Sequence, residues 1–261
     1  MTDADFKFFE EHGYLILRGH ADPGRITALR QRVEDLMQGR RRYEGMFFQR
    51  ESNRSVTVFS GPSNDYRKIK DLEYDAEFLC FIQNETFQAV SRRYISAPAA
   101  SMRAMVMNKP PLCPARVPFH QDISDLWDMS APPVLTIWTA LEDATVANGC
   151  LQVIPGSHRL GKVGGGHNVD EAELADIVRR TPPLHIELAA GESIVFFNTL
   201  IHGSGPNTLP RSRLAFTLCL MDITVVNTKL GRAYPQVHGP GAMTLADVQG
   251  LTRVPAHVYD A

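Results

Sequence analysis

Six short apolar runs in the second part of the chain are the feature that most constrains its fold. Turn residues such as Pro155-Gly156 and Ala190-Gly191 separate the runs, a pattern typical of β-strands. The runs occupy residues 102–108, 134–141, 150–154, 185–188, 193–197 and 214–226, and one helical stretch at 170–180 interrupts them. Many short strands after a helical leader favour a mainly β fold with flanking helices, of the jelly-roll, cupin-like kind.

The first hundred residues are expected to form that helical leader. Asp22 is a good N-cap with Pro23 at the first helical position, and apolar residues continue at helical spacing until Gly39. The expected elements of the leader are a helix over 3–10, a turn into a strand over 12–17, the helix that begins at Pro23, a strand over 56–59 and the longest helix over 75–94. The whole chain predicts a single domain, with the leader at about 1–100, the jelly-roll core at about 101–226 and a C-terminal tail at 227–261.

Two histidines and an aspartate in the strand-rich part have the residue types and spacing of a metal site. His120 and Asp122 are two residues apart, so on an extended strand both side chains point to the same side. His202 lies where an apolar strand ends in a glycine-rich turn, a position that often presents ligands. Two histidines and one carboxylate on one face of a metal are typical of non-heme Fe(II) oxygenases. Taken alone, a His-x-Asp triplet is equally consistent with a surface histidine beside an aspartate.

Composition narrows the class of protein. Hydrophobic residues make up 44% and charged residues 21% of the 261 residues, as in ordinary globular proteins. A net charge of −2 creates no field over the whole protein that would attract nucleic acid or a membrane surface, so neither partner is expected. The four cysteines form no C-x-x-C pair, no apolar run is long enough to span a bilayer, and the first residues are acidic where a signal peptide would be basic. We therefore expect a cytoplasmic monomer or homodimer.

Several separate motifs resemble those of the phytanoyl-CoA dioxygenase family, in the order that the family has them. The resemblance extends from about Lys68 to about Asp222. The motifs are Met105-Val106-Met107-Asn108-Lys109-Pro110-Pro111, Phe119-His120-Gln121-Asp122, Trp138-Thr139-Ala140-Leu141-Glu142-Asp143, Asn148 to His158, and Ile201-His202-Gly203-Ser204-Gly205-Pro206-Asn207.

The resemblance implies a double-stranded β-helix that holds Fe(II) and the co-substrate 2-oxoglutarate and reacts with dioxygen. His120, Asp122 and His202 would be the metal ligands, in agreement with the residue chemistry. Arg213 lies at the family's offset from His202, and its guanidinium can pair with a carboxylate of 2-oxoglutarate through two hydrogen bonds, with Arg211 as the nearby alternative. The other co-substrate positions that the resemblance implies are Ser204, Lys68, Gln121, Trp138 and Met105. Turn, surface and core roles are the alternatives for these residues.

The implied reaction converts 2-oxoglutarate to succinate and carbon dioxide while a small-molecule metabolite is hydroxylated. A carboxylate at Asp122 leaves no vacant chloride site, so halogenation is disfavoured. Alternatives are an acyl-CoA 2-hydroxylase, desaturation, cyclisation or epimerisation by the same iron chemistry, and a metal-binding barrel without activity. The candidate substrate residues are Gln49, Ile123, Asp125 and Trp127, with Arg50 and Arg54 as further polar contacts. Arg40-Arg41-Arg42 is either a solvated loop or a cradle for an anionic substrate.

Overall fold

Two antiparallel sheets form the centre of the molecule. The computed structural model describes residues 1–95, 98–164 and 166–255. Within those residues the larger sheet has eight strands, in the order β1-β9-β6-β11-β4-β3-β2 with β14 paired to β4. Its strands are β1 Tyr14–Leu17, β2 Phe48–Arg50, β3 Tyr66–Lys70, β4 Ala99–Lys109, β6 Leu135–Ala140, β9 Ser193–Phe197, β11 Arg213–Asp222 and β14 Gln236–His238.

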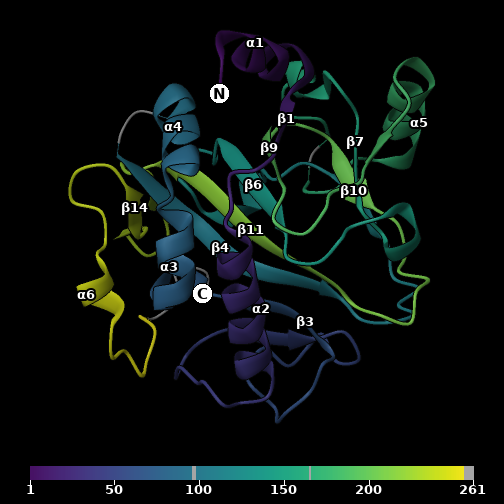
Figure 1. Cartoon of the computed structure of the whole chain (residues 1–261). Helices are drawn as coiled ribbons and strands as arrows, with labels where there is room; N and C mark the ends of the chain where they lie inside the picture. Colours follow the sequence, from purple (N-terminus) through teal and green to yellow (C-terminus); the bar gives the residue numbers. More distant parts are fainter. Residues whose placement is uncertain (96–97, 165, 256–261) are drawn as a thin grey trace.

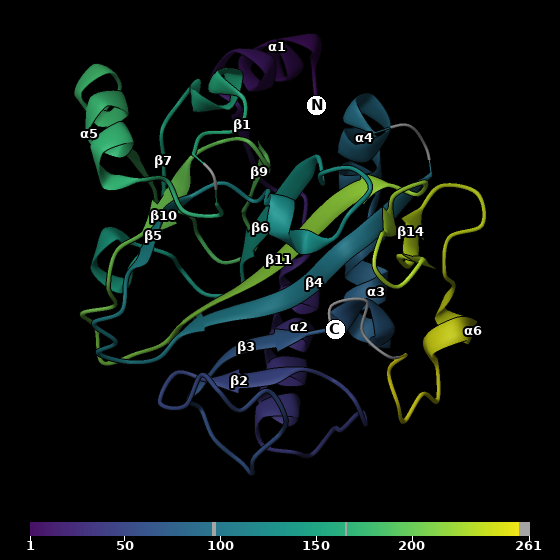
Figure 2. The same ribbon diagram turned by 180° about the vertical axis from the view of Figure 1, so that it is seen from behind.

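The smaller sheet faces one part of the larger sheet and completes the jelly roll that the sequence predicts (Figure 2). It contains four strands in the described part of the chain, in the order β5-β10-β7-β8. They are β5 Val117–His120, β7 Leu151–Val153, β8 Leu184–Ile186 and β10 His202–Ser204. A separate two-stranded ribbon joins β12 Val226–Asn227 to β13 Arg232–Ala233.

Helices cover the outer face of the larger sheet. Figures 1 and 2 show α2, α3 and α4 on the side of β4 and β11 that faces away from the smaller sheet. Their apolar side chains, among them Leu29 and Phe78, pack with Phe216 of β11 in the largest core cluster. The helices are α1 Asp3–His12, α2 Pro23–Met37, α3 Ala76–Ile82, α4 Glu85–Tyr94, α5 Glu171–Arg180 and α6 Leu245–Val248, with short 3-10 turns η1 Leu72–Tyr74, η2 Asp125–Trp127, η3 Val146–Asn148 and η4 Ser157–Leu160.

Three predicted elements differ from the structure. Residues 56–59 form no strand, and the strands of this region are β2 and β3 instead. The predicted longest helix over 75–94 is two helices, because the side chain of Asn84 caps the backbone N–H of Phe87 and starts α4 as a new helix. The longest helix is therefore α2, with 15 residues. The run over 214–226 ends as a strand at Asp222.

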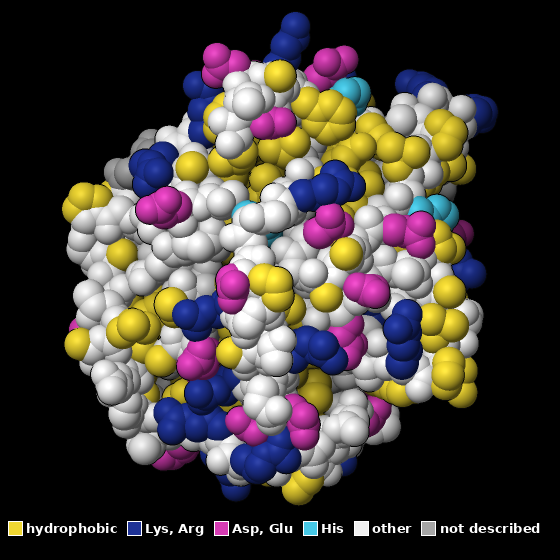
Figure 3. Space-filling view, viewed as in Figure 1, with side chains coloured by type: hydrophobic (Ala, Val, Ile, Leu, Met, Phe, Trp, Pro, Cys, Tyr) yellow, Lys and Arg dark blue, Asp and Glu magenta, His cyan; other side chains and the backbone are white. Residues whose placement is uncertain are grey.

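The expected C-terminal tail contributes to both the sheet and the core. β14 pairs with β4, and Val237, Val248 and Val254 are buried in the largest core cluster. Residues 256–261 of that tail lie outside the described residues. In the part of the chain that the structure covers, no helix has the length and apolar character that crossing a membrane requires. On the face shown in Figure 3, acidic and basic side chains are interspersed.

Candidate metal centre and its cavity

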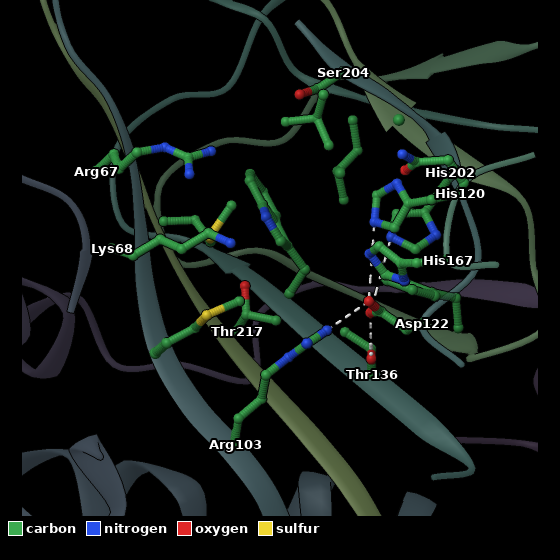
Figure 4. Close-up of a pocket in the computed structure, with 18 of the residues that line it drawn as sticks. Arg67, Lys68, Arg103, His120, Asp122, Thr136, His167, His202, Ser204 and Thr217 are labelled. Atoms are coloured by element: carbon green, nitrogen blue, oxygen red, sulfur yellow. Dashed lines mark hydrogen bonds and ion pairs between the residues drawn. The ribbon is translucent and has the colours of Figure 1, made fainter. Parts of the chain in front are cut away.

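A cavity of about 220 Å³ lies between the two sheets, and most of the predicted site residues line it (Figure 4). The larger sheet contributes residues from β3, β4, β6 and β11, and the smaller sheet contributes residues from β5, β7 and β10. We call this space the central cavity. Its position between two sheets allows residues that are far apart in the sequence to face one another.

His120 and His202 are direct neighbours across the β5–β10 pair. The Nδ1 atom of His120 lies 2.8 Å from the carbonyl oxygen of Pro118, and that of His202 lies 3.0 Å from the carbonyl oxygen of Leu200. Each carbonyl accepts the Nδ1 proton, so each Nε2 keeps its lone pair for a metal. Gly203 allows the two strands to approach, because a Cβ atom there would lie 2.9 Å from the carbonyl oxygen of Val117.

Asp122 completes the cluster just after β5. Its Oδ1 lies 3.9 Å from Nε2 of His120, and its Oδ2 lies 3.8 Å from Nε2 of His202. The three candidate ligand atoms lie within 4.8 Å of one another, and all three residues are buried. The backbone N–H of Asp122 donates to the carbonyl oxygen of Asn198 at 2.8 Å, which fixes this end of the strand. One metal ion can therefore contact all three side chains.

The protonation states of the cluster suit a cation. Burial, with repulsion from the neighbouring His202, lowers the pKa of His120 to about 3, and burial also lowers the pKa of His202. Burial alone would raise the pKa of Asp122, but Arg103 and the two histidines hold it well below its usual range. At neutral pH the cluster therefore presents two neutral imidazoles and one carboxylate, the states that metal binding requires.

Arg213 is the predicted co-substrate anchor, and it lies buried in the wall of the same cavity. Its side chain is 2% exposed, and in the described structure its Nε and Nη1 atoms have no hydrogen-bond partner. The guanidinium lies over the ring of Trp138, 5.2 Å from the ring centroid. Burial lowers its pKa to about 10, so it stays charged at neutral pH. Arg211, the alternative anchor, is exposed.

Ser204, Lys68, Trp138 and Met105 also line the central cavity. Lys68 comes from β3, which places a strand of the helical leader beside β4 of the jelly roll. Burial, with repulsion from Arg67, lowers the pKa of Lys68 to about 7. Its neighbour Lys70 lies over the ring of Phe47, 4.2 Å from the centroid, and is not among the lining residues.

Gln121 does not line the cavity, although it was expected to contact the co-substrate. Its side-chain nitrogen donates to the carbonyl oxygens of Gly161 at 2.8 Å and Thr199 at 2.5 Å. Its side-chain oxygen accepts from the backbone N–H of Val163 at 2.8 Å. Because neighbouring side chains on an extended backbone point to opposite sides, Gln121 faces away from the cavity when His120 and Asp122 face into it. The structure therefore gives it the place of a core residue that joins three segments.

The candidate substrate residues are dispersed. Ile123 is buried, and Asp125 has a largely exposed side chain that forms an ion pair with Lys162. The ring centroid of Trp127 lies 5.4 Å from the guanidinium carbon of Arg103, which lines the cavity. Gln49 pairs with Lys68 across β2 and β3 and accepts a hydrogen bond from Arg67 at 2.9 Å. In the described structure, none of these four residues lines the central cavity.

Several cavity residues were not predicted from the sequence, among them Arg103, Thr136, His167 and Arg67. Arg103 donates to Oδ1 of Asp122 at 2.5 Å, and the hydroxyl of Thr136 donates to Oδ2 at 2.9 Å. His167 lies beside His120 with 4.7 Å between the ring centroids, and Arg67 lines the opposite wall. Arg103 had a detectable signal, because a charged residue two positions before Met105 on an apolar strand shares its face. His167 had none, since it lies in a loop.

Comparisons with known proteins agree with this geometry. The sequence profile described as Phytanoyl-CoA dioxygenase (PhyH) matches residues 9–215. A probable phytanoyl-CoA dioxygenase of Caenorhabditis elegans is 29% identical over 255 residues, which cover 92% of this chain and 80% of that protein. EctD from S. alaskensis, solved with 2-oxoglutarate and 5-hydroxyectoine, has a TM-score of 0.68 at 19% identity. The superposition covers 98% of this chain and 87% of the EctD chain. SnoK, an alpha-ketoglutarate-dependent carbocyclase from nogalamycin biosynthesis, has a TM-score of 0.67 at 19% identity. The superposition covers 87% of this chain and 86% of SnoK.

The jelly roll and the cluster of two histidines and one carboxylate define the class of Fe(II)- and 2-oxoglutarate-dependent dioxygenases, and this chain is such an enzyme. Within that class, the chain belongs to the phytanoyl-CoA dioxygenase family, whose profile matches most of its length.

Proposed function

We propose that the protein hydroxylates a small-molecule metabolite and converts 2-oxoglutarate to succinate and carbon dioxide in the same reaction. The observation that carries this proposal is the buried guanidinium of Arg213, which shares one cavity with His120, Asp122 and His202. Two of its nitrogen atoms have no hydrogen-bond partner among the described residues. Unsatisfied buried donors are costly, and a carboxylate of a bound 2-oxo acid would satisfy them.

The donor set also fits iron. Two neutral imidazoles and one carboxylate on one side of an ion are the ligands of non-heme Fe(II) oxygenases, and they leave positions open for small ligands. When bound, the ion and the 2-oxo acid supply the oxidising chemistry together with dioxygen. The three side chains that would hold the iron are His120, Asp122 and His202.

The remaining cavity residues would orient the co-substrate and limit access of water. Arg213 and Ser204 would bind the distal carboxylate, and Trp138 would support the guanidinium through its ring face. Lys68 reaches the cavity from β3 and would add positive charge beside the bound acid. Met105 supplies an apolar part of the wall. A buried cavity of this kind strengthens these electrostatic contacts.

A second candidate, an acyl-CoA 2-hydroxylase, is favoured by the name of the relative from Caenorhabditis elegans. The same iron ligands also serve desaturation, cyclisation and epimerisation. Product mass separates these outcomes, since hydroxylation adds one oxygen and desaturation removes two hydrogens. A barrel that binds metal without turnover would bind iron and fail to consume 2-oxoglutarate.

An anaerobic titration tests the proposal directly. The apo-protein is titrated with Fe(II) and then with 2-oxoglutarate, and the visible charge-transfer band of a chelated 2-oxo acid is recorded. We expect the band to form and to decay when oxygen is admitted, with succinate as a product. Iron binding without the band would contradict the co-substrate site and would support the barrel without activity.

We further propose that the protein is cytoplasmic and acts on its small substrate as a monomer or homodimer. The four cysteines are free thiols, which suits a reducing compartment. Fractionation of cells and light scattering of the purified protein test the location and the oligomeric state.

A further inference from the structure

We propose that the substrate is a small free carboxylic acid, and that Arg103 binds its carboxylate beside the metal. This inference rests on the proposed function, because it assigns the substrate class of the same site. It makes Arg103 the residue that determines specificity, and it places the oxidised carbon close to the acid group.

Arg103 and Arg213 serve different parts of the cavity. β4 and β11 run antiparallel, and Arg103 pairs with Cys219, six residues along β11 from Arg213. A strand rises by about 3.3 Å per residue, so the two arginines start from points roughly 20 Å apart. In Figure 4, Ser204 lies on one side of the histidines and Arg103 on the opposite side, beyond Asp122. The carboxylate of a 2-oxo acid held at Arg213 and Ser204 would therefore lie far from Arg103.

Arg103 is close to where a metal would be held. Its Nη2 atom donates to Oδ1 of Asp122 at 2.5 Å, and Asp122 is a candidate metal ligand. A second carboxylate that accepts from the same guanidinium would therefore lie close to a metal held by Asp122. Carbon atoms one or two bonds from that carboxylate would then be the ones nearest the metal. A guanidinium has five N–H donors, so contact with Asp122 is compatible with a second acceptor.

The positive charge of the cavity favours the binding of one more anion. Among the described lining residues, four are cationic, Arg67, Lys68, Arg103 and Arg213, and one is acidic, Asp122. Glu51 lies 2.9 Å from Arg67 and balances it. The two charges of Fe(II) and those of 2-oxoglutarate cancel, and Asp122 balances one arginine. The described lining residues therefore stay positively charged in sum when the ion and the 2-oxo acid are bound. Because an unbalanced buried charge is costly, a singly charged substrate fits the loaded cavity better than a neutral one.

Two aromatic rings lie beside the proposed carboxylate site. Trp127 is next to the Arg103 guanidinium, and its ring centroid is 5.3 Å from that of His167, which lines the cavity. The ring of His167 would contact the body of the acid, and Trp127, which does not line the cavity, would pack against that ring. The cavity of about 220 Å³ also has to hold the 2-oxo acid, which favours a small substrate.

The experiment uses the iron-loaded protein with saturating 2-oxoglutarate, kept anaerobic. Phenylacetate and hexanoate are the probes, and their primary amides are neutral controls of the same shape. The shift of the charge-transfer band reports probe binding, and its retained intensity shows that 2-oxoglutarate has not been displaced. We expect both acids to shift the band of the wild-type protein and the amides to have little effect.

Variants separate substrate binding from mere support of Asp122. Arg103→Gln should weaken binding of the acids by about 10- to 100-fold, as expected for a charged hydrogen-bonded pair. Arg103→Lys should retain part of the binding, and Arg92→Gln, a change on the exposed surface of α4, should leave it unchanged. The iron content and the band without probe are measured in each variant, since a supporting role alone would lower these and leave the preference for acids intact.

Three results would overturn the inference. They are equal binding of acids and amides, acid binding that persists in Arg103→Gln, and a wild-type band that does not respond to either acid. Failure of the proposed function has a different signature, because the band would then be absent before any probe is added.

Discussion

The hydroxyl of Thr136 lies 2.9 Å from Oδ2 of Asp122, although the two residues belong to different parts of the double-sheet structure. Thr136 comes from β6 in the larger sheet, and Asp122 follows β5 in the smaller one. The same hydroxyl also lies 2.9 Å from Oδ1 of Asn198. Thr136 therefore helps to orient the only carboxylate among the candidate metal ligands.

Replacement of Thr136 by valine should weaken Fe(II) binding by about 10- to 100-fold, because partners that orient a ligand typically contribute this much to metal affinity. Valine keeps the shape of the side chain and removes the hydroxyl. Anaerobic calorimetric titration measures the change, and Thr136→Ser should retain near wild-type affinity. An unchanged dissociation constant in the valine variant would show that Arg103 alone holds Asp122 in place.

Replacement of His202 by alanine should reduce iron affinity by more than about 100-fold, since a lost ligand costs more than a lost partner of a ligand. Turnover should fall below detection. Iron content after gel filtration is the measurement, and His185→Ala, at an exposed histidine of β8, is the matched control. Wild-type iron content in the His202 variant would refute the ligand assignment.

Replacement of Arg213 by alanine should weaken 2-oxoglutarate binding by about 2–4 kcal/mol, or roughly 30- to 700-fold in Kd, because a buried charge-assisted pair is lost. The intensity of the charge-transfer band against 2-oxoglutarate concentration gives the constant. Arg211→Ala is a close control, because this arginine is two residues away and exposed. Equal effects of the two changes would remove the anchor role from Arg213.

Replacement of Gln121 by leucine should lower the free energy of unfolding by about 2–4 kcal/mol, because two carbonyl groups and one N–H group lose their buried partner. Denaturant titration of the apo-protein measures this change. The Kd for 2-oxoglutarate should stay within about twofold of wild type, since the side chain does not line the cavity. A large loss of 2-oxoglutarate affinity at unchanged stability would restore the co-substrate role.

The stability of the apo-protein should depend on pH through Lys68. Burial lowers its pKa to about 7 from an ordinary value of 10.5. Between these two values the unfolded chain binds more protons than the folded chain, so the contribution of Lys68 to stability rises with pH, by at most about 1.4 kcal/mol per pH unit. Below pH 7 both states are protonated and the full cost of the buried charge remains.

Comparison with Lys68→Met isolates this effect from the other titrating groups. The difference in the free energy of unfolding between the two proteins should be greatest in favour of methionine below pH 7, and it should shrink as the pH approaches 10. A difference that is constant from pH 6 to pH 10 would show that Lys68 has an ordinary pKa in the folded state.

The strands of the jelly roll were largely predictable, because period-two patterns and turn residues depend on local sequence. β9 has the bounds that the sequence predicts, and β4 and β6 lie within three residues of theirs. The elements of the helical leader were harder to predict. The pattern over 75–94 is apolar on one side throughout, and only the cap at Asn84 reveals two helices. The strand expected at 56–59 is absent because pairing with β4 selects β3, a contact that no local pattern contains.

In the site as well, features set by local sequence could be predicted, and features set by contacts between distant segments could not. Residues whose role follows from spacing, such as His120 and Asp122, were found from the sequence. Gln121 lies between them, and the alternation of side chains along the strand turns it away from the cavity, whereas the family resemblance implied a contact with the co-substrate. The spacing from Met105 places Arg103 on the cavity face of its strand, but its contact with Asp122 crosses the two sheets, for which the sequence has no fixed spacing.

The side chains that donate to the Asp122 carboxylate, Thr136 and Arg103, both belong to the larger sheet, whereas the histidines beside it belong to the smaller one. An ion held by this cluster is therefore positioned by both sheets at once. Its affinity then depends on the separation of the sheets, so packing changes in the core between them, for instance at Ile194 or Val153, alter metal binding without touching a ligand. Conversely, bound iron would resist separation of the sheets, which makes the metal a part of the folding energetics of the barrel as well as of its chemistry.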